Sequence, residues 1–235
     1  MDPQQLKTAE TFDQYKDNYS QSVDQAVAFT GMKTDFFTRV KADYLLETAA
    51  NHFGKTHSLD ALDVGCGVGN YHPLVAPSLR SLAGVDVSSA CIQTAKERNP
   101  TIKYEHYLGE NLPFAGQSFD LVFTICVMHH VPPTNWPDFA REMHRVLRPG
   151  GIVLVFEHNP SNVLTMRAVN NCPFDEDAVL MTSKTTKDLY AKAGFSEISV
   201  RYILSVPPFN KFMRKIDRLF SPVGLGAQYF IKCQK

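Results

Sequence analysis

Three glycines follow a buried apolar stretch of the chain at intervals of two residues. They are Gly65, Gly67 and Gly69, and they come directly after residues 59–64, which have the pattern of a buried strand. Because glycine lacks a Cβ atom and tolerates positive φ, such a turn lets the backbone approach a ligand closely. Ligands of open α/β sheets bind at the carboxyl ends of the strands. We therefore predict a ligand-binding turn that includes Asp63, Gly65, Cys66 and Gly67.

The spacing around this turn indicates the class of ligand. A dinucleotide-binding motif, G-x-G-x-x-G, requires a third glycine where this chain has Asn70. Asp86 ends the next apolar stretch at about the 20-residue spacing at which an acid binds a ribose. Its carboxylate could accept both hydroxyls of the sugar, and Val87 follows it at the same strand end. The pattern favours a nucleoside without a pyrophosphate over NAD, and Asp63 suits a ligand that carries positive charge.

Four segments in this order resemble a known family. They are D-V-G-C-G-V-G-N, V-D-V-S, L-P-F-A-G-Q-S-F-D-L-V and V-L-R-P-G-G, within about residues 59–157. Together they resemble the successive motifs of class I S-adenosylmethionine-dependent methyltransferases, and they are most similar to the small-molecule branch called methyltransferase type 11. The resemblance implies S-adenosyl-L-methionine as the cofactor and S-adenosyl-L-homocysteine as the product. It implies methyl transfer to an oxygen, nitrogen or carbon nucleophile of a small molecule by in-line displacement.

The order of the expected elements agrees with this resemblance. Strands alternate with helices and a late antiparallel pair follows, which favours an α/β fold with a mostly parallel sheet. The resemblance implies a Rossmann-like, seven-stranded sheet with helices on both faces and an antiparallel last strand. We expect a single domain over residues 1–235, with a helical lid at 1–35. Residues 158–182 and 205–222 are expected to be insertions on the rim, near the substrate.

One cofactor contact departs from the family pattern. An acid usually accepts the adenine amino group a few residues before L-P-F, and here Leu108 occupies that position. Glu110, a backbone carbonyl near Gly109 and Asn111 are the expected substitutes. We also place Ile125 and Cys126 at the cofactor, because they end the fourth apolar strand.

Candidate bases lie after the fourth and fifth strands. His158 is the preferred base or substrate hydrogen-bonding group, because histidine titrates near neutral pH and function concentrates at strand ends. His129 is equally compatible with catalysis and with lining the pocket. His130 is a candidate substrate contact, although packing is favoured for it, and Glu157 could orient His158 or contact substrate. The alternative function is a binding protein that keeps the fold without catalysis.

Other polar and aromatic residues have ordinary explanations beside functional ones. Tyr15 and Tyr19 could cover the ligand or pack as part of an amphipathic helix. Lys41 is expected to be a solvated charge, or else to reach the carboxylate of the cofactor's methionine part. The acids at 175–177 are expected to be a solvated helix start, although they could be metal ligands. His72 is expected at the surface or rim.

The composition limits the partners. The net charge is zero, whereas a general nucleic-acid binder normally carries a basic face. No apolar run reaches the roughly 18 residues of a membrane span, and no secretory signal pattern begins the chain. The five cysteines include no C-x-x-C pair, so we predict no metal site and a reduced, cytoplasmic protein. We expect a small-molecule substrate, no nucleic acid, no membrane, and a monomer or homodimer.

Overall fold

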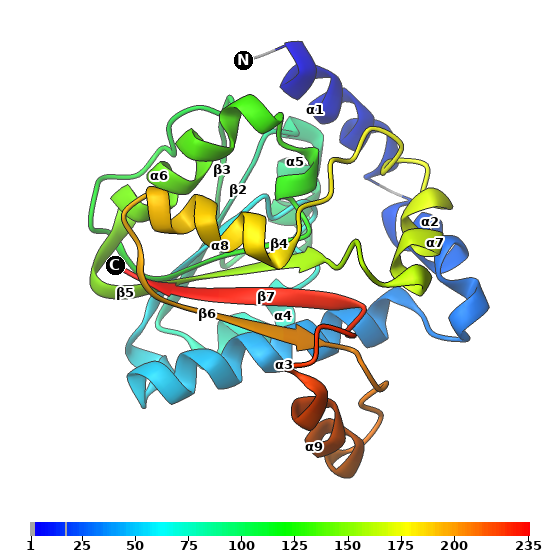
Figure 1. Cartoon of the computed structure of the whole chain (residues 1–235). Helices are drawn as coiled ribbons and strands as arrows, with labels where there is room; N and C mark the ends of the chain where they lie inside the picture. Colours follow the sequence, from blue (N-terminus) through cyan, green and yellow to red (C-terminus); the bar gives the residue numbers. More distant parts are fainter. Residues whose placement is uncertain (1–2, 17) are drawn as a thin grey trace.

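Seven strands form one sheet at the centre of the molecule (Figure 1). The computed structural model describes residues 3–16 and 18–235. The spatial order of the strands is β3-β2-β1-β4-β5-β7-β6. Their bounds are β1 Asp60–Val64, β2 Ser81–Asp86, β3 Lys103–His106, β4 Phe119–Ile125, β5 Leu147–His158, β6 Ser196–Ile203 and β7 Gln228–Gln234.

The first five strands are parallel, and β7 is inserted antiparallel between β5 and β6. The crossover point of the order lies between β1 and β4, where chain connections leave in opposite directions. An open α/β sheet binds its ligands at such a point. The fold class and the antiparallel last strand predicted from the sequence are confirmed.

The apolar strands β4 and β5 are covered on both faces. Along β5, Val153 and Val155 face one hydrophobic cluster, whereas Ile152, Leu154 and Phe156 face another. Alternate side chains of a strand point to opposite faces, so a continuous apolar run indicates burial on both. This burial holds the strand ends, and the residues after them, in fixed positions.

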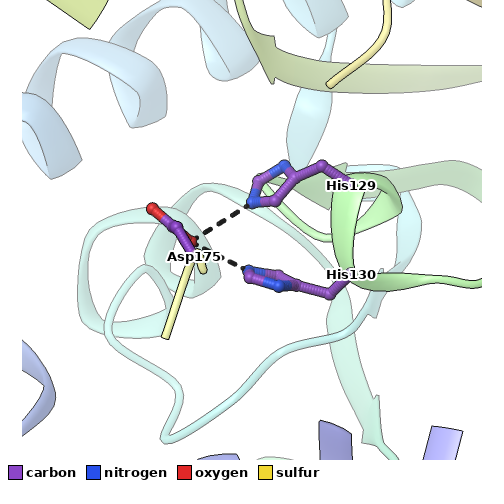
Figure 2. A group of neighbouring side chains, drawn as sticks. All are labelled: His129, His130 and Asp175. Carbon is purple, nitrogen blue, oxygen red and sulfur yellow. Dashed lines mark ion pairs between the residues drawn. The ribbon is translucent and has the colours of Figure 1, made fainter. Parts of the chain in front are cut away.

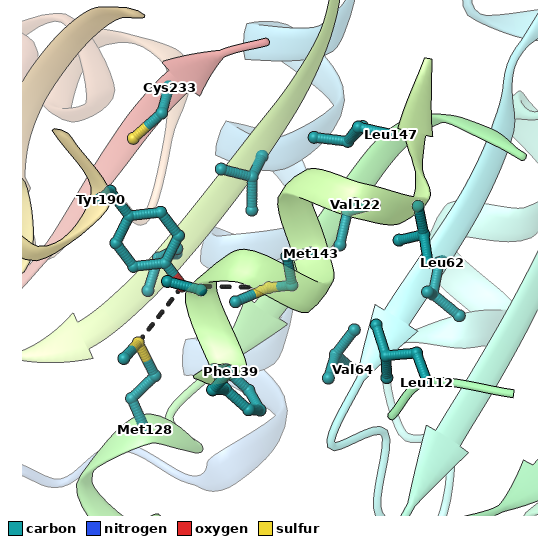
Figure 3. Packing of buried hydrophobic residues seen from close by; sticks show 14 of the residues in the cluster. Leu62, Val64, Leu112, Val122, Met128, Phe139, Met143, Leu147, Tyr190 and Cys233 are labelled. Carbon is teal, nitrogen blue, oxygen red and sulfur yellow. Dashed lines mark hydrogen bonds between the residues drawn. The ribbon is translucent and has the colours of Figure 1, made fainter. Parts of the chain in front are cut away.

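Helices pack on both faces of the sheet (Figure 1). Helix α3 covers one face, and α6 and α8 cover the other. Figure 3 shows the core on the α6–α8 side, where the Tyr190 hydroxyl lies 3.3 Å from the sulfur of Met128.

The α-helices are α1 Pro3–Tyr15, α2 Tyr19–Ala26, α3 Thr34–Phe53, α4 His72–Val75, α5 Ser89–Arg98, α6 Trp136–Val146, α7 Val163–Asn170, α8 Ser183–Lys192 and α9 Lys211–Phe220. The 3-10 turns are η1 Ala28–Thr30, η2 Thr56–Ser58, η3 Ala76–Ser78, η4 Met128–His130 and η5 Pro133–Asn135. Within the described chain no helix has both the length and the apolar character needed to cross a membrane.

The segments expected at the rim occupy different places. Helices α1 and α2, from the proposed lid, lie beyond the strand ends, with α2 beside α7 (Figure 1). Helix α9 instead packs beside α3, where Arg214 and Arg218 form ion pairs with Asp43 and Glu47. Residues 1, 2 and 17 of the predicted lid lie outside the described residues. That residues 1–35 move as a lid, and that residues 158–182 and 205–222 contact the substrate, remain predictions.

Candidate active site

A cavity of about 990 Å³ opens at the carboxyl ends of β1, β2 and β4. We call it the turn cavity, because the glycine turn forms one wall. Eight of the residues predicted to bind cofactor line it, and they are Asp63, Gly65, Cys66, Gly67, Asp86, Val87, Ile125 and Cys126. Helix α1 closes the opposite side with Gln5, Thr8 and Phe12. The sequence therefore located the strand-end wall of this cavity.

The glycines of the turn have positive φ, as the sequence predicts. Gly65 has φ of +79°, and a Cβ there would lie 2.5 Å from the side chain of Val127. Gly67 has φ of +51°, and a Cβ there would meet nothing within 4 Å. Gly65 is therefore needed for close packing inside the protein. Gly67 leaves its backbone open toward the turn cavity, where a ligand can approach it.

The Asp86 carboxylate is fixed by two backbone donors. The N–H of Gly67 donates to Oδ2 at 2.7 Å, and the N–H of Ser88 donates to Oδ1 at 2.8 Å. Burial raises the pKa of this carboxyl to about 6, against the two donors, which favour its charged form. A carboxylate accepts more than one hydrogen bond at each oxygen. Asp86 is thus oriented in advance to accept ligand hydroxyls.

Asp63 belongs to a buried chain of polar groups. His72 Nε2 lies 3.0 Å from Asp63 Oδ2, and the other ring nitrogen contacts the Tyr104 hydroxyl. Burial raises the pKa of Asp63, although His72 favours the charged carboxylate. His72 is fully buried, so its expected place at the surface is wrong. Its role is to hold Asp63, which also lines the turn cavity.

Two predicted cofactor residues lie elsewhere. Glu110 and Asn111 line a separate cavity with residues of α6 and do not line the turn cavity. Leu108 is 54% exposed. The reason is that the backbone turns away after Tyr107, which is the last residue of this segment in the turn cavity. The Gly109 carbonyl, another expected substitute, accepts a hydrogen bond from Gln5 Nε2 at 3.1 Å.

A second cavity, of about 1430 Å³, adjoins the first. We call it the outer cavity, because α2, α3 and α7 enclose it outside the sheet. The residues common to both cavities are Phe12, Tyr19, Asn70, Tyr71, Ile125, Cys126 and His130. Two ligands could therefore meet at a shared wall.

A buried charged group lies against this shared wall, on the side of the outer cavity. Lys41 is 6% exposed, its Nζ is 3.6 Å from Cys126 Sγ and 5.8 Å from the ring centre of Tyr71. Burial opposes the charged form of Cys126, but Lys41 and His158 overcome this effect and lower the thiol pKa to about 7. Cys126 also has φ of +57°, which is strained for a residue with a side chain. Lys41 is thus buried at the site, and its expected exposure is wrong.

His129 lies between the carboxylates of Glu157 and Asp175, and Figure 2 shows its contact with Asp175. Its Nδ1 is 2.6 Å from Glu157 Oε2, and its Nε2 is 3.8 Å from Asp175 Oδ1. Burial disfavours the imidazolium, but Glu157 and Asp175 outweigh it and raise the His129 pKa well above its usual value. A charged imidazole with both nitrogens facing acids cannot accept a proton. This arrangement argues against His129 as the general base.

Asp175 joins both histidines of the pair. His130 Nε2 lies 3.3 Å from Asp175 Oδ1, and His129 together with burial lowers the pKa of His130 to about 4. Asp175 is buried in a loop after α7, so the predicted solvated helix start is wrong. These three side chains could approach one ion. Because metal ligands must be deprotonated, an ion here would compete with the proton that His129 holds between its two carboxylates.

The other predicted catalytic and substrate residues divide between the cavity walls and the interior. His158 lines the outer cavity, with Nδ1 3.4 Å from Gln228 Nε2. Glu157 lines neither cavity, because it is buried behind His129 and accepts the N–H of Met128 at 2.9 Å. It orients His129 and not His158.

The aromatic residues expected in the lid lie at the cavities and also pack. Tyr19 stacks on Phe174 with ring centres 5.1 Å apart, and Tyr15 meets the same ring edge-on at 5.5 Å. Tyr15 lines the turn cavity, and Tyr19 and His130 line both cavities. The residues that sequence analysis missed are Gln5, Tyr71 and Gln228, and no local pattern marks them.

The chain is similar to methyltransferases in sequence and in fold. Residues 62–155 match a family described as a methyltransferase domain. An uncharacterized methyltransferase of Synechocystis is 39% identical over 104 residues, which cover 44% of this chain and 49% of that protein. A Mycolicibacterium smegmatis protein, named "Probable S-adenosylmethionine-dependent methyltransferase", is 28% identical over 61% of this chain and 60% of its own length. The matches thus span less than two thirds of either relative.

A solved structure shares the fold over almost the whole chain. It is a SAM-dependent methyltransferase from Thermotoga maritima, described as a possible histamine N-methyltransferase. The TM-score is 0.70 at 19% identity, and the alignment covers 97% of this chain and 99% of that one. At this identity the likeness establishes the fold alone.

Proposed function

We propose, from the premise that residues 62–155 form a class I S-adenosylmethionine-dependent methyltransferase domain, that this chain methylates a small molecule. The single observation that carries the proposal is the shared wall of two cavities. The turn cavity has the groups that a nucleoside needs, and the outer cavity provides room for a second molecule beside it. The region that matches the methyltransferase family contains the glycine turn and Asp86. The sequence match and the turn cavity therefore support the proposal through the same residues.

The residues of the turn cavity fit S-adenosylmethionine. Asp86 would accept the ribose hydroxyls, and Gly67 leaves its backbone open to the ligand. The buried carboxylate of Asp63 would face the positively charged part. When bound, this cofactor supplies a methyl group on a sulfonium, which is a good leaving group. The protein's contribution is then chiefly to align the acceptor and to exclude water.

His158 is our proposed base for an acceptor that must lose a proton. It lines the outer cavity at the end of β5, beside Cys126 and Gln228. His129 would act as a positioning residue, since its ion pairs fix η4 and Asp175. The inactive alternative has no observation in its favour.

The first test is calorimetric titration with S-adenosylmethionine, S-adenosylhomocysteine and NAD. We expect micromolar binding of the first two and none of NAD. Asp86→Ala should weaken binding by about 100-fold, since it removes charge-assisted hydrogen bonds to both hydroxyls. Asp138→Ala, at an exposed carboxylate of α6, is the control. Binding of NAD alone, or equal binding by both variants, would contradict the proposed cofactor site.

The second test identifies the acceptor and then examines His158. A mixture of small molecules is incubated with the protein and S-adenosylmethionine, and methylated products are found by mass spectrometry. With a hydroxyl acceptor, His158→Asn should lower the turnover rate by about 100-fold and leave S-adenosylhomocysteine affinity unchanged. An unchanged rate would exclude His158 as the base.

A further inference from the structure

Much of the outer cavity is lined by apolar side chains, and His129, His130 and Asp175 add a polar group beside them. Phe29, Phe37, Leu164 and Val169 are among the apolar lining residues. Lys41, Cys126, His158 and Gln228 gather at the end that adjoins the turn cavity. A molecule that fills this cavity would need an apolar body and a polar group at one end.

Lys41 provides the charge at that end. Within residues 3–16 and 18–235, no aspartate or glutamate forms an ion pair with its ammonium group, although it contacts Cys126 and Tyr71. A buried cation is costly unless an anion and hydrogen bonds compensate it. Cys126, whose thiol pKa Lys41 lowers, is a partial partner, and an anion of the bound molecule would complete the pairing.

Two further buried polar atoms of the outer cavity lack partners in the described chain. Gln228 is 7% exposed, and its Oε1 is buried without a hydrogen-bond partner among the described residues. The hydroxyl oxygen of Ser205 is in the same condition, and both residues line the outer cavity. The Ser205 hydroxyl can donate a hydrogen bond to the same anion, whereas the Gln228 amide oxygen only accepts and would need a donor on the ligand. Such unpaired buried atoms are uncommon in folded proteins, and a bound ligand is one way to satisfy them.

We propose that the methyl acceptor is an apolar molecule with one acidic group, whose anion pairs with Lys41 in the outer cavity. The inference rests on the proposed function, since the outer cavity is an acceptor site only if the turn cavity holds the cofactor. The carboxylate of the cofactor's methionine part is the other source of an anion at Lys41. The experiment therefore separates these two sources.

The probes are 2-naphthoate and the neutral 2-naphthamide, titrated into the protein saturated with S-adenosylhomocysteine. We expect naphthoate to bind about tenfold more tightly than the amide. Lys41→Met should remove that preference, Lys41→Arg should retain it, and Lys33→Met, an exposed position at the start of α3, should leave it unchanged. Thermal unfolding of each variant shows whether it is folded. If Lys41→Met does not fold, the comparison of the two probes is made with Lys41→Arg.

Each remaining outcome overturns the proposal. Equal affinity for the two probes, or no binding of naphthoate at millimolar concentration, excludes an acidic acceptor at Lys41. If Lys41→Met weakens binding of S-adenosylhomocysteine but not of 5′-methylthioadenosine, which lacks the carboxylate, Lys41 binds the cofactor's carboxylate instead of the acceptor. Failure of the wild-type protein to bind S-adenosylhomocysteine would contradict the proposed function itself. The titration of the wild-type protein with this compound distinguishes that failure from a failure of the acceptor proposal.

A different observation concerns the far end of the turn cavity. Beyond Asp86 it is lined by Val87, Tyr107, Val131 and Gln5. Gln5 is 4% exposed, its Nε2 is bound to the Gly109 carbonyl, and its Oε1 is buried without a partner among the described residues. Leu108 is exposed outside this cavity, and Glu110 lines another one.

The structure assigns Gln5 Oε1 as the acceptor for the adenine amino group. The apolar side chains at this end suit a flat ring, and the amide oxygen is the unpaired acceptor beside them. Because Gln5 lies on α1, the recognition of the base would belong to the N-terminal segment and not to the loop after β3. Cofactor binding would then order α1 over the turn cavity.

The test compares S-adenosylhomocysteine with its inosine counterpart, in which a carbonyl oxygen replaces the amino group. Gln5→Leu should weaken binding of the adenosyl compound by about tenfold and change the affinity for the inosyl compound by no more than about twofold. Gln4→Leu, at an exposed position one residue earlier, is the control. Equal effects on both compounds, or none on either in folded variants, would overturn the assignment.

Discussion

The turn cavity and the outer cavity are built from different parts of the fold. The turn cavity is formed largely by residues at the ends of parallel strands, held by backbone hydrogen bonds such as Gly67 N–H to Asp86. The outer cavity is enclosed by helices α2, α3 and α7, and its polar residues are fixed by side-chain pairs such as His129 with Glu157. Backbone geometry defines one site, and tertiary packing defines the other.

This difference indicates how the two sites can change. A substitution in the turn alters main-chain conformation and should therefore affect the ligand bound at the strand ends. A substitution around the outer cavity alters one helix or one ion pair, and the sheet remains as it is. The following predictions test whether the two cavities are separable in this way.

The largest effect on stability is expected at Asp175. Asp175→Asn removes one of the two carboxylates around the His129 imidazolium, and should lower the free energy of unfolding by about 2 kcal/mol at pH 7. The pKa of His129 is raised, so its contribution is complete below pH 6.5 and is lost as pH rises through the folded value. The pKa of Asp175 is lowered, so its contribution is present above its unfolded value and is lost in acid.

Urea unfolding at pH 7 measures this change. Asp177→Asn, at an exposed carboxylate two residues later, should leave stability unaltered. S-adenosylhomocysteine affinity should stay within about twofold in Asp175→Asn. A large loss of affinity would show that the cavities are coupled through this ion pair.

A smaller effect is expected from two glycines that share one conformation. Gly67 and Gly31 have φ of +51° and +70°, and a Cβ at either would meet nothing within 4 Å. Alanine at each should cost about 1 kcal/mol of stability through backbone strain. Only Gly67→Ala should also weaken binding of S-adenosylhomocysteine, by about tenfold, because its Cβ would lie where the ligand approaches the backbone. Equal affinities by calorimetry would show that the turn is not in contact with the ligand.

The pH dependence of cofactor binding should follow Asp86. Its pKa is raised to about 6 by burial, and the ionised form is the better acceptor for two hydroxyls. Binding therefore favours loss of the proton, and affinity should rise about tenfold from pH 5 to pH 7 and then level off. Asp86→Asn should bind weakly and without this dependence. A flat profile for the wild-type protein would contradict the assigned role.

The smallest effect is expected from restoring the family's acid. Leu108→Asp should leave S-adenosylhomocysteine affinity within about twofold, because position 108 is exposed outside the turn cavity. A clear gain in affinity would mean that the loop after β3 reaches the adenine when the cofactor is bound. The assignment to Gln5 would then need revision.

Sequence reasoning succeeded where function depends on neighbouring residues. The glycine turn and Asp86 could be located because strand ends, glycine spacing and acid position are all local properties. Lys41 and Asp175 could not be located in this way. Their burial depends on α3 meeting the end of β4, and on the loop after α7 folding onto η4. Glu110 was misplaced for a related reason, since the path of the chain after Tyr107 is set by contacts with α1 and α6.

The antiparallel insertion of β7 has a consequence for the order of folding. Strand β6 is made before β7, yet its pairing to the sheet is with β7 alone among the described strands. Residues 196–203 therefore join the sheet only through residues 228–234, which pair with β5 on their other edge. Because long-range strand pairing is slow, we expect the completion of this edge to depend on contacts between distant parts of the chain.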